Sequence, residues 1–160
     1  MAAHENILYF GDLNYRIQLS NEEARSLAQQ DACSKLVAAD QLSTCMREKR
    51  VFVGFSEGPL VFRPTYKYDN GSDVYDSSEK QRIPSWTDRI LYRGTGLDLL
   101  RYNRAELMLS DHRPGESPLH SNAAHLPKSK SPSCSLWYFQ GGRQGDRPWQ
   151  ERSDRERTSC

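Results

Sequence analysis

The distribution of apolar residues limits the part of this chain that can form a core to about 110 of its 160 residues. Phe, Trp, Tyr, Ile, Leu and Val are concentrated between residues 7 and 109, whereas Ser, Pro, Arg, Gln and Gly dominate from Gly115 onward. A segment with few apolar side chains cannot bury enough surface to offset the entropy lost on folding. We therefore expect one domain over residues 1–114. Residues 115–160 are expected to form a polar tail that is either disordered or not homologous to that domain.

The charge of the chain is almost balanced, because 22 basic and 21 acidic residues give a net charge of +1. Such a chain has no global field that attracts nucleic acid or an anionic membrane, so an anion site must be local. Cys33, Cys45, Cys134 and Cys160 lack metal-ligand spacing, which predicts free thiols in a reducing, cytoplasmic compartment. No signal peptide or transmembrane run is visible in the sequence.

The hydrophobic pattern predicts a strand followed by helices. Residues 7–10 form a short, continuous apolar run that ends at Gly11, which is typical of a buried strand. Ser20 and Glu23 match a capping box and predict a helix over residues 21–30. Apolar spacing over residues 36–46, interrupted near Asp40, predicts two further short helices.

Strands and loops are expected in the rest of the domain. Alternating residues predict strands over 85–92 and 105–109. Prolines and turn residues predict loops and edge strands over 51–64, and the polar stretch 69–83 predicts a long surface loop. This order of elements fits the α/β or α+β class, with chemistry on the loops where strands end.

Two polar clusters follow predicted strands. Asp12 and Asn14 lie two residues apart after Gly11, so in an extended strand both side chains would point to one side and suit a water or a metal-bound phosphate. The second cluster is residues 110–114, Ser-Asp-His-Arg-Pro. Taken alone, each cluster is also explained by an ordinary turn.

Four motifs in order favour a functional interpretation. They are residues 10–16 (Phe-Gly-Asp-Leu-Asn-Tyr-Arg), 64–69 (Pro-Thr-Tyr-Lys-Tyr-Asp), 79–91 (which contains Pro-Ser-Trp-Thr-Asp-Arg) and 110–114. With them, residues 4–114 closely resemble the catalytic domain of the inositol polyphosphate 5-phosphatases, particularly the synaptojanin-like phosphoinositide 5-phosphatases. The resemblance implies the two-sheet α/β sandwich of the endonuclease/exonuclease/phosphatase (deoxyribonuclease I-like) group. It also implies removal of the 5-phosphate from lipids such as phosphatidylinositol 4,5-bisphosphate, or from soluble inositol phosphates.

The resemblance further implies catalytic roles. Asp12 would activate or orient the attacking water, and Asn14 would bind that water or a phosphate oxygen. His112 would stabilise the negative charge that develops on the scissile phosphate, and Asp88 would form a hydrogen bond with His112 and raise its basicity. Asp111 would lie near a magnesium ion, whose preference for oxygen ligands suits a carboxylate.

The resemblance also implies a binding site for the neighbouring 4-phosphate. Tyr66, Lys67 and Lys80 match the family positions that hold this phosphate, and Arg82 would lie beside them. Lysines suit the task as point charges around a phosphate dianion. On the tip of a loop, the same side chains could instead simply be solvated.

The chain departs from the family pattern at both ends. The N-terminal half of the catalytic domain, which carries the main magnesium-binding glutamate and a second histidine, has no counterpart here, and the final strand after Pro114 is also missing. We therefore expect a partial sandwich with an exposed apolar face, marginal stability, and weak or absent hydrolysis. The alternative is a non-catalytic fragment that binds phosphoinositide head groups peripherally at a membrane. A nuclease is disfavoured, because the balanced charge offers no basic groove for nucleic acid.

Overall fold

The structure is a computed structural model that describes residues 6–121. Within this range, a first strand is followed by three short helices and then by further short strands. The elements are β1 (Ile7–Asp12), α1 (Asn21–Gln29), α2 (Cys33–Ala38), α3 (Gln41–Arg47), β2 (Ser56–Glu57), β3 (Asp88–Arg93), β4 (Leu97–Leu99), β5 (Asn103–Arg104), β6 (Gly115–Glu116) and β7 (Leu119–Ser121). The order confirms the α+β class predicted from the sequence.

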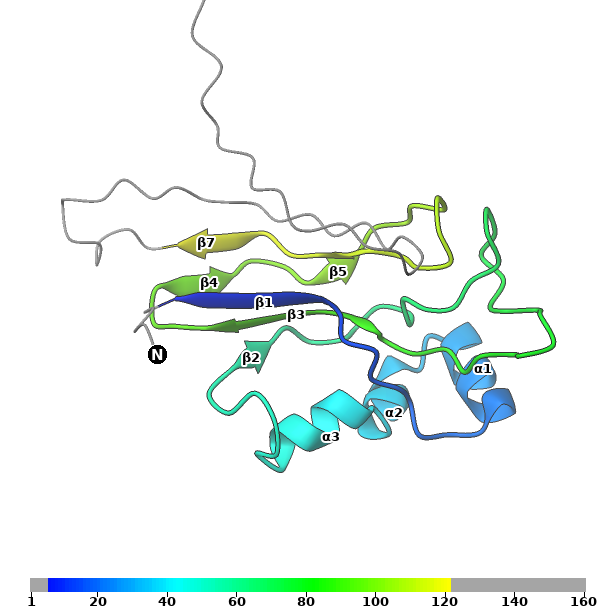
Figure 1. Cartoon of the computed structure of the whole chain (residues 1–160), viewed down its shortest axis with the longest axis horizontal. Coiled ribbons are helices and arrows are strands. Elements are labelled where there is room, and N and C mark those ends of the chain that lie inside the picture. The colour runs from blue at the N-terminus through cyan, green and yellow to red at the C-terminus, as the bar shows by residue number, and fades with distance from the viewer. Residues whose placement is uncertain (1–5, 122–160) are drawn as a thin grey trace, which may run out of the picture.

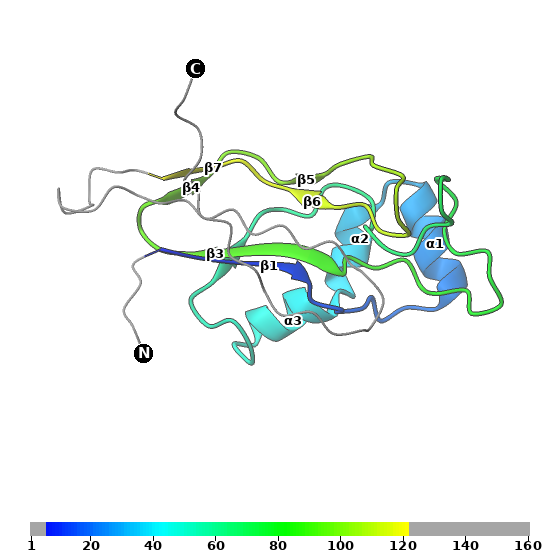
Figure 2. The ribbon, with the colours of Figure 1, turned by 45° about the horizontal axis from the view of Figure 1, so that its top comes forward.

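The strands form two layers, and the helices cover one of them. In the first layer the strand order is β1-β3-β2, with antiparallel pairing. In the second layer β4 pairs with β7 and β5 pairs with β6. The first layer lies between the helices and the second layer (Figures 1 and 2), and β3 contacts β6 across the layers. The described residues therefore form part of a two-sheet sandwich, as expected.

Side-chain caps fix the beginnings of two helices. The Oγ atom of Ser20 accepts a hydrogen bond from the backbone N–H of Glu23 at 3.2 Å, which sets the first turn of α1. Asp40 caps α3 in the same way, because its Oδ2 atom accepts from the backbone N–H of Ser43 at 2.8 Å. These caps confirm the predicted helix over 21–30 and the predicted interruption near Asp40.

The apolar core lies between the helices and β3. Trp86 has no exposed surface, and its indole N–H donates to the backbone oxygen of Phe62 at 3.0 Å. The ring of Phe62 meets the edge of the Tyr102 ring, with centroids 5.1 Å apart. The other buried members of this core are Ile17, Ala24, Ala28, Cys33, Leu36, Leu60, Tyr68 and Tyr75. This core supports the segment that precedes β3.

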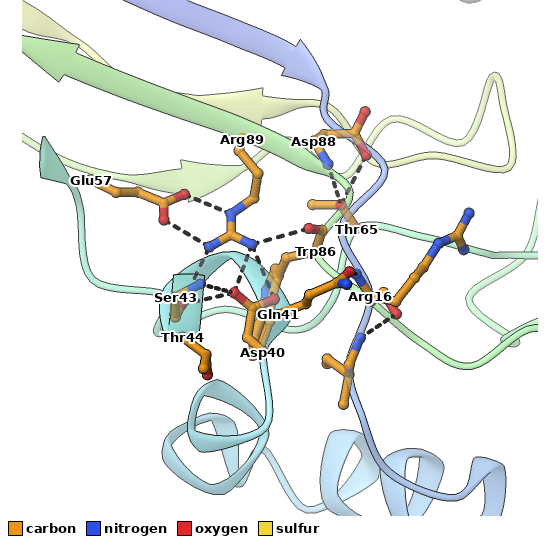
Figure 3. A network of polar contacts seen from close by, with 12 residues as sticks. Arg16, Asp40, Gln41, Ser43, Thr44, Glu57, Thr65, Trp86, Asp88 and Arg89 are labelled. Carbon is orange, nitrogen blue, oxygen red and sulfur yellow. Dashed lines mark hydrogen bonds and ion pairs between the residues drawn. The ribbon is translucent and has the colours of Figure 1, made fainter. Parts of the chain in front are cut away.

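A buried ion cluster attaches β3 to α3 and β2 (Figure 3). The side chain of Arg89 is fully buried and donates to both carboxylate oxygens of Glu57 at 2.7 Å. The same guanidinium donates to the buried carboxylate of Asp40 at 2.9 Å and 3.1 Å. Because successive residues of a strand point to opposite faces, this cluster holds the strand from the face opposite to Asp88.

The first strand is more exposed than the sequence predicted. The strand exists, but it continues through Gly11 to Asp12, and Leu8, Tyr9 and Phe10 are 45%, 48% and 44% exposed. Among the described residues β1 pairs on one side only, with β3, so it is an edge strand. The predicted burial of this strand is therefore wrong, because an apolar run does not reveal whether a neighbouring strand and a covering layer are present.

The predicted strand over residues 105–109 is absent. Leu107 and Leu109 are 51% and 93% exposed, and this segment has no regular pairing within the described range. Pairing occurs instead in β5, just before it, and in β6 and β7, which lie beyond the boundary we placed after Pro114. Residue alternation was misleading here because a strand also needs a partner at the correct distance. Residues 122–160 of the expected tail lie outside the described residues.

Two remaining expectations concern cysteines and membrane spans. Cys33 and Cys45 are free, as predicted, and both are buried, while Cys134 and Cys160 lie outside the described residues. Over residues 6–121, no helix has the length and apolar character needed to cross a membrane.

Candidate active site

The pairing of β1 with β3 brings two predicted catalytic carboxylates together. The antiparallel register places Asp12 directly opposite Asp88 at the end of both strands. One residue further along, the backbone N–H of Leu13 donates to the backbone oxygen of Thr87 at 2.7 Å, which extends the pairing. The two aspartates are 76 positions apart in the sequence, so this contact depends on the strand register alone.

Asp88 and His112 form the central contact of the site. The Nδ1 atom of His112 lies 2.9 Å from Oδ2 of Asp88, and the side chains are 26% and 18% exposed. The same carboxylate oxygen accepts hydrogen bonds from Oγ1 of Thr65 and from Oγ1 of Thr87, each at 2.9 Å. An ionised carboxylate only accepts, so Nδ1 of His112 carries a proton and Nε2 is the nitrogen that remains for a ligand.

The surroundings of His112 favour its charged form. Partial burial of the imidazole opposes protonation, but the hydrogen bond and the negative charge of Asp88 raise the pKa of His112 above its usual value. The negative charges of Asp12 and Asp111 add to this increase in the pKa. The site therefore holds an imidazole whose charged form suits a phosphate oxygen.

Asn14 reaches the site through a turn and not through the strand. Its φ angle of 57° places it in the left-handed region, and its backbone N–H donates to Oδ1 of Asp12 at 2.9 Å. The expectation that Asp12 and Asn14 share one strand face is therefore wrong, because β1 ends at Asp12 and an aspartate-centred turn follows. The guanidinium of Arg16 donates to the side-chain oxygen of Asn14 and orients this amide.

One of the predicted phosphate-binding residues, Tyr66, adjoins the histidine. The centre of the Tyr66 ring lies 4.6 Å from the centre of the His112 ring and 4.7 Å from the guanidinium of Arg16. Lys67 forms an ion pair with Asp76, with 3.3 Å between Nζ and Oδ1. Tyr66 therefore places an aromatic ring beside the imidazole, while the ammonium group of the next residue, Lys67, is held by Asp76.

The two remaining predicted phosphate-binding residues occupy the loop that follows Asp76. Lys80 and Arg82 are exposed there, and the backbone N–H of Arg82 donates to Oδ2 of Asp76 at 2.8 Å. The structure confirms the expected absence of helix and strand over 69–83, although Tyr75 and Asp76 within it are buried. The loop is thus partly anchored in the core while its cationic side chains remain accessible.

The described carboxylates do not form a metal site of their own. Over residues 6–121 there is no group of three or more His, Cys, Asp or Glu residues that could hold a metal ion. Asp111, the predicted magnesium neighbour, accepts from the hydroxyl of Ser110 at 3.2 Å, while Oδ1 of Asp12 and Oδ2 of Asp88 already accept hydrogen bonds. Because the described residues contain no clustered set of ligands, we derive no chemical step that passes through a metal.

Several residues that support the site were missed in the sequence. Thr65 and Thr87 hold Asp88, and Arg16 orients Asn14. Arg113 is fully buried, and its guanidinium lies 4.2 Å from the centre of the Tyr68 ring, so it fastens the segment that carries His112. All of these residues stand inside the four motifs, but the order of residues along the chain does not indicate which distant residues they contact.

Known proteins are similar in sequence to most of this chain. Residues 1–116 match the protein family described as "Endonuclease/Exonuclease/phosphatase family 2". The chain is 53% identical over 114 residues to the polyphosphatidylinositol phosphatase INP53 of Saccharomyces cerevisiae, and the match covers 69% of this chain and 10% of that protein. It is 43% identical over 141 residues to human synaptojanin-1, covering 70% of this chain and 9% of that protein.

Solved structures show the same fold. The crystal structure of the inositol polyphosphate 5-phosphatase domain of SPsynaptojanin, in complex with inositol (1,4)-bisphosphate and calcium ion, matches with a TM-score of 0.73 and 46% identity. The match covers 75% of this chain and 35% of that one, so the chain spans about a third of the related domain structure. A ferrous NO complex of Cimex nitrophorin also matches, with a TM-score of 0.67 and 35% identity. Because one fold occurs both in a phosphatase domain and in a nitrophorin, the site residues must carry the functional argument.

Proposed function

Since the chain belongs to endonuclease/exonuclease/phosphatase family 2, we propose that its site acts on the 5-phosphate of an inositol phosphate, either a phosphoinositide lipid or a soluble inositol polyphosphate. The single observation that supports this most strongly is the contact between His112 and Asp88, with Asp12 opposite in the strand register. The names of the similar proteins, which are phosphatases of inositol lipids and inositol phosphates, support the substrate class.

The proposed chemistry assigns different tasks to the acidic and basic groups. Asp12 accepts a proton from water while the water oxygen bonds to phosphorus, and Asn14 holds the water or a phosphate oxygen. The imidazolium of His112 stabilises the negative charge that grows on the phosphate oxygens, and Asp88 keeps this ring oriented and charged. The bond between phosphorus and the C5 oxygen of inositol then breaks, and that oxygen takes up a proton from solvent water and leaves as a hydroxyl group.

The turnover of this chain by itself is proposed to be weak or absent. The described residues supply the histidine, its aspartate and the base, but they lack a set of ligands for a divalent cation. A phosphoryl transfer loses much of its charge stabilisation when such ligands are missing. The activity of the longer relatives therefore does not transfer directly to a chain that matches about a third of the related domain.

The experiment is phosphate release from phosphatidylinositol 4,5-bisphosphate in the presence of magnesium, with an intact relative assayed in parallel. We expect a rate far below that of the relative, with the residual activity removed by Asp12→Ala and by His112→Ala. Turnover close to that of the relative would contradict the proposed weakness. Residual activity that survives both substitutions would contradict the assignment of the site.

A second candidate function is head-group binding without turnover, peripherally at a membrane. It is favoured by the cationic groups beside Tyr66, since Lys67 is already held in place and Lys80 and Arg82 are exposed on the same loop. This function predicts binding to liposomes that contain phosphatidylinositol 4,5-bisphosphate and no phosphate release. Binding that is insensitive to charge reversal at Lys67 and Lys80 would remove it.

A further inference from the structure

Asp76 is a buried carboxylate in a loop that otherwise faces solvent. The residue is 1% exposed, although its neighbours on the C-terminal side are exposed. Its Oδ1 atom accepts from Oγ of Ser78 at 2.7 Å and from Nζ of Lys67 at 3.3 Å. Its Oδ2 atom accepts from the backbone N–H of Arg82 at 2.8 Å. One side chain therefore connects Lys67 to the segment that carries Lys80.

Asp76 remains negatively charged in this environment. Burial opposes ionisation, but the hydrogen bonds from Ser78, from the backbone of Arg82 and from Lys67 hold the pKa of Asp76 well below its usual range. A charged acceptor makes stronger hydrogen bonds than a neutral one, so each of these contacts is firm. Asp76 thus acts as a fixed anchor for the groups around it.

The backbone of the loop is held by contacts that do not use the carboxylate. The N–H of Asp76 donates to the backbone oxygen of Lys67 at 2.9 Å, and the N–H of Ser77 donates to Oδ1 of Asp69 at 3.0 Å. From α1, Arg25 donates to the backbone oxygens of Tyr75 and Asp76, each at 2.7 Å. Loss of the carboxylate charge would therefore change how Lys67 and the following turn are oriented while these backbone contacts remain.

Building on the proposed function, we propose that Asp76 is a positioning residue for a second substrate phosphate, next to the one that reacts at His112. It holds the ammonium group of Lys67 in one place and fixes the turn that presents Lys80. Tyr66 precedes Lys67, and its ring lies 4.6 Å from the His112 ring, so the backbone that carries Lys67 continues directly from a residue that contacts the reacting centre. A phosphate dianion then binds a cation whose conformational freedom is already restricted, and less entropy is lost on binding.

The charge of Asp76 also has an effect that opposes the binding of a phosphate. A negative charge next to Lys67 weakens the attraction of that ammonium for an anion. If this repulsion dominated, neutralising Asp76 would tighten the binding of a phosphate. Our inference is that positioning outweighs repulsion, because Asp76 is buried and bound to several donors while Lys67 keeps two further N–H donors for a ligand.

The test is calorimetric titration of the full chain with two probes, inositol 1,4-bisphosphate and inositol 1-phosphate. We expect Asp76→Asn to lower the affinity for the bisphosphate by about tenfold, the scale of one hydrogen bond to a charged group, and to leave the monophosphate unchanged. Glu79→Gln is the matched control, because it removes an equal charge from an exposed position of the same loop and should leave both affinities unchanged.

A double-mutant cycle with Lys67→Met separates positioning from a general loss of structure. If Asp76 acts through Lys67, then Asp76→Asn adds little further loss in the Lys67→Met background. Full additivity of the two losses, equal losses for both probes, or tighter binding by Asp76→Asn would overturn the proposal. Failure of the unaltered chain to bind the bisphosphate would instead overturn the proposed function on which this inference rests.

Discussion

The buried ion cluster around Arg89 predicts a large effect of one substitution on the free energy of unfolding. The substitution Arg89→Met keeps most of the length of the side chain but leaves the carboxylates of Asp40 and Glu57 without the guanidinium that neutralises them (Figure 3). Breaking a buried ion pair from one side costs about 3–5 kcal/mol, because the remaining charge stays buried and uncompensated. A domain of ordinary stability has about 5–15 kcal/mol in total. We therefore expect Arg89→Met to lose a large part of the stability of this fold.

The assay is urea unfolding and thermal unfolding of the full chain, followed by circular dichroism. For a domain of this size, the loss corresponds to a decrease in Tm of about 10–20 °C. The matched control is Arg101→Met, because Arg101 pairs with Glu116 at the surface, where the side chains are 64% and 41% exposed. An exposed pair of this kind contributes little to stability, so the control should unfold like the unaltered chain.

A compensating variant tests the electrostatic origin of the effect. Adding Asp40→Asn and Glu57→Gln to Arg89→Met removes the unpaired charges, so the triple variant should recover part of the lost stability. If Arg89→Met is no less stable than Arg101→Met, the reasoning is refuted. If the triple variant is less stable than Arg89→Met alone, packing by the side chains outweighs their charge.

Three further outcomes are expected. Asp88→Asn should lower the pKa of His112 in an NMR titration. Because the pKa of His112 is raised in the folded chain, protonated His112 stabilises the fold fully below the usual histidine pKa, and this stabilisation is lost as the pH rises through the raised pKa. Asp88→Asn should therefore make the stability of the fold less dependent on pH. Gly58→Ala should cost about 1–3 kcal/mol in urea unfolding, since an added Cβ would lie 2.6 Å from Cβ of Tyr102, and an unchanged midpoint would contradict this. Phe10→Lys should reduce self-association in sedimentation experiments, because Phe10 is 44% exposed on an edge strand, and equal association would show that this edge is not the contact.

The sequence was a reliable guide where a feature depends on nearby residues. The capping residues Ser20 and Asp40 lie within a few positions of the backbone groups they bind, so the helix starts could be predicted from local spacing. The four motifs, which occur in one order along the chain, also contained Asp88 and Tyr66, which contact His112. Burial of residues 7–10 could not be predicted in the same way, since exposure depends on which other strand or layer covers an apolar run.

Contacts between distant residues were decided by the tertiary structure alone. The register of β1 and β3 places Asp12 opposite Asp88, and a shift of one residue would move every side chain of the strand to the other face. Lys67 likewise pairs with Asp76 in a loop whose backbone is bound by Arg25 of α1, a contact between residues 51 positions apart. By itself, the sequence determined which chemical groups are present, the family to which the chain belongs and where its helices begin. Only the fold decided which of them meet, because strand register and burial depend on the whole packed chain.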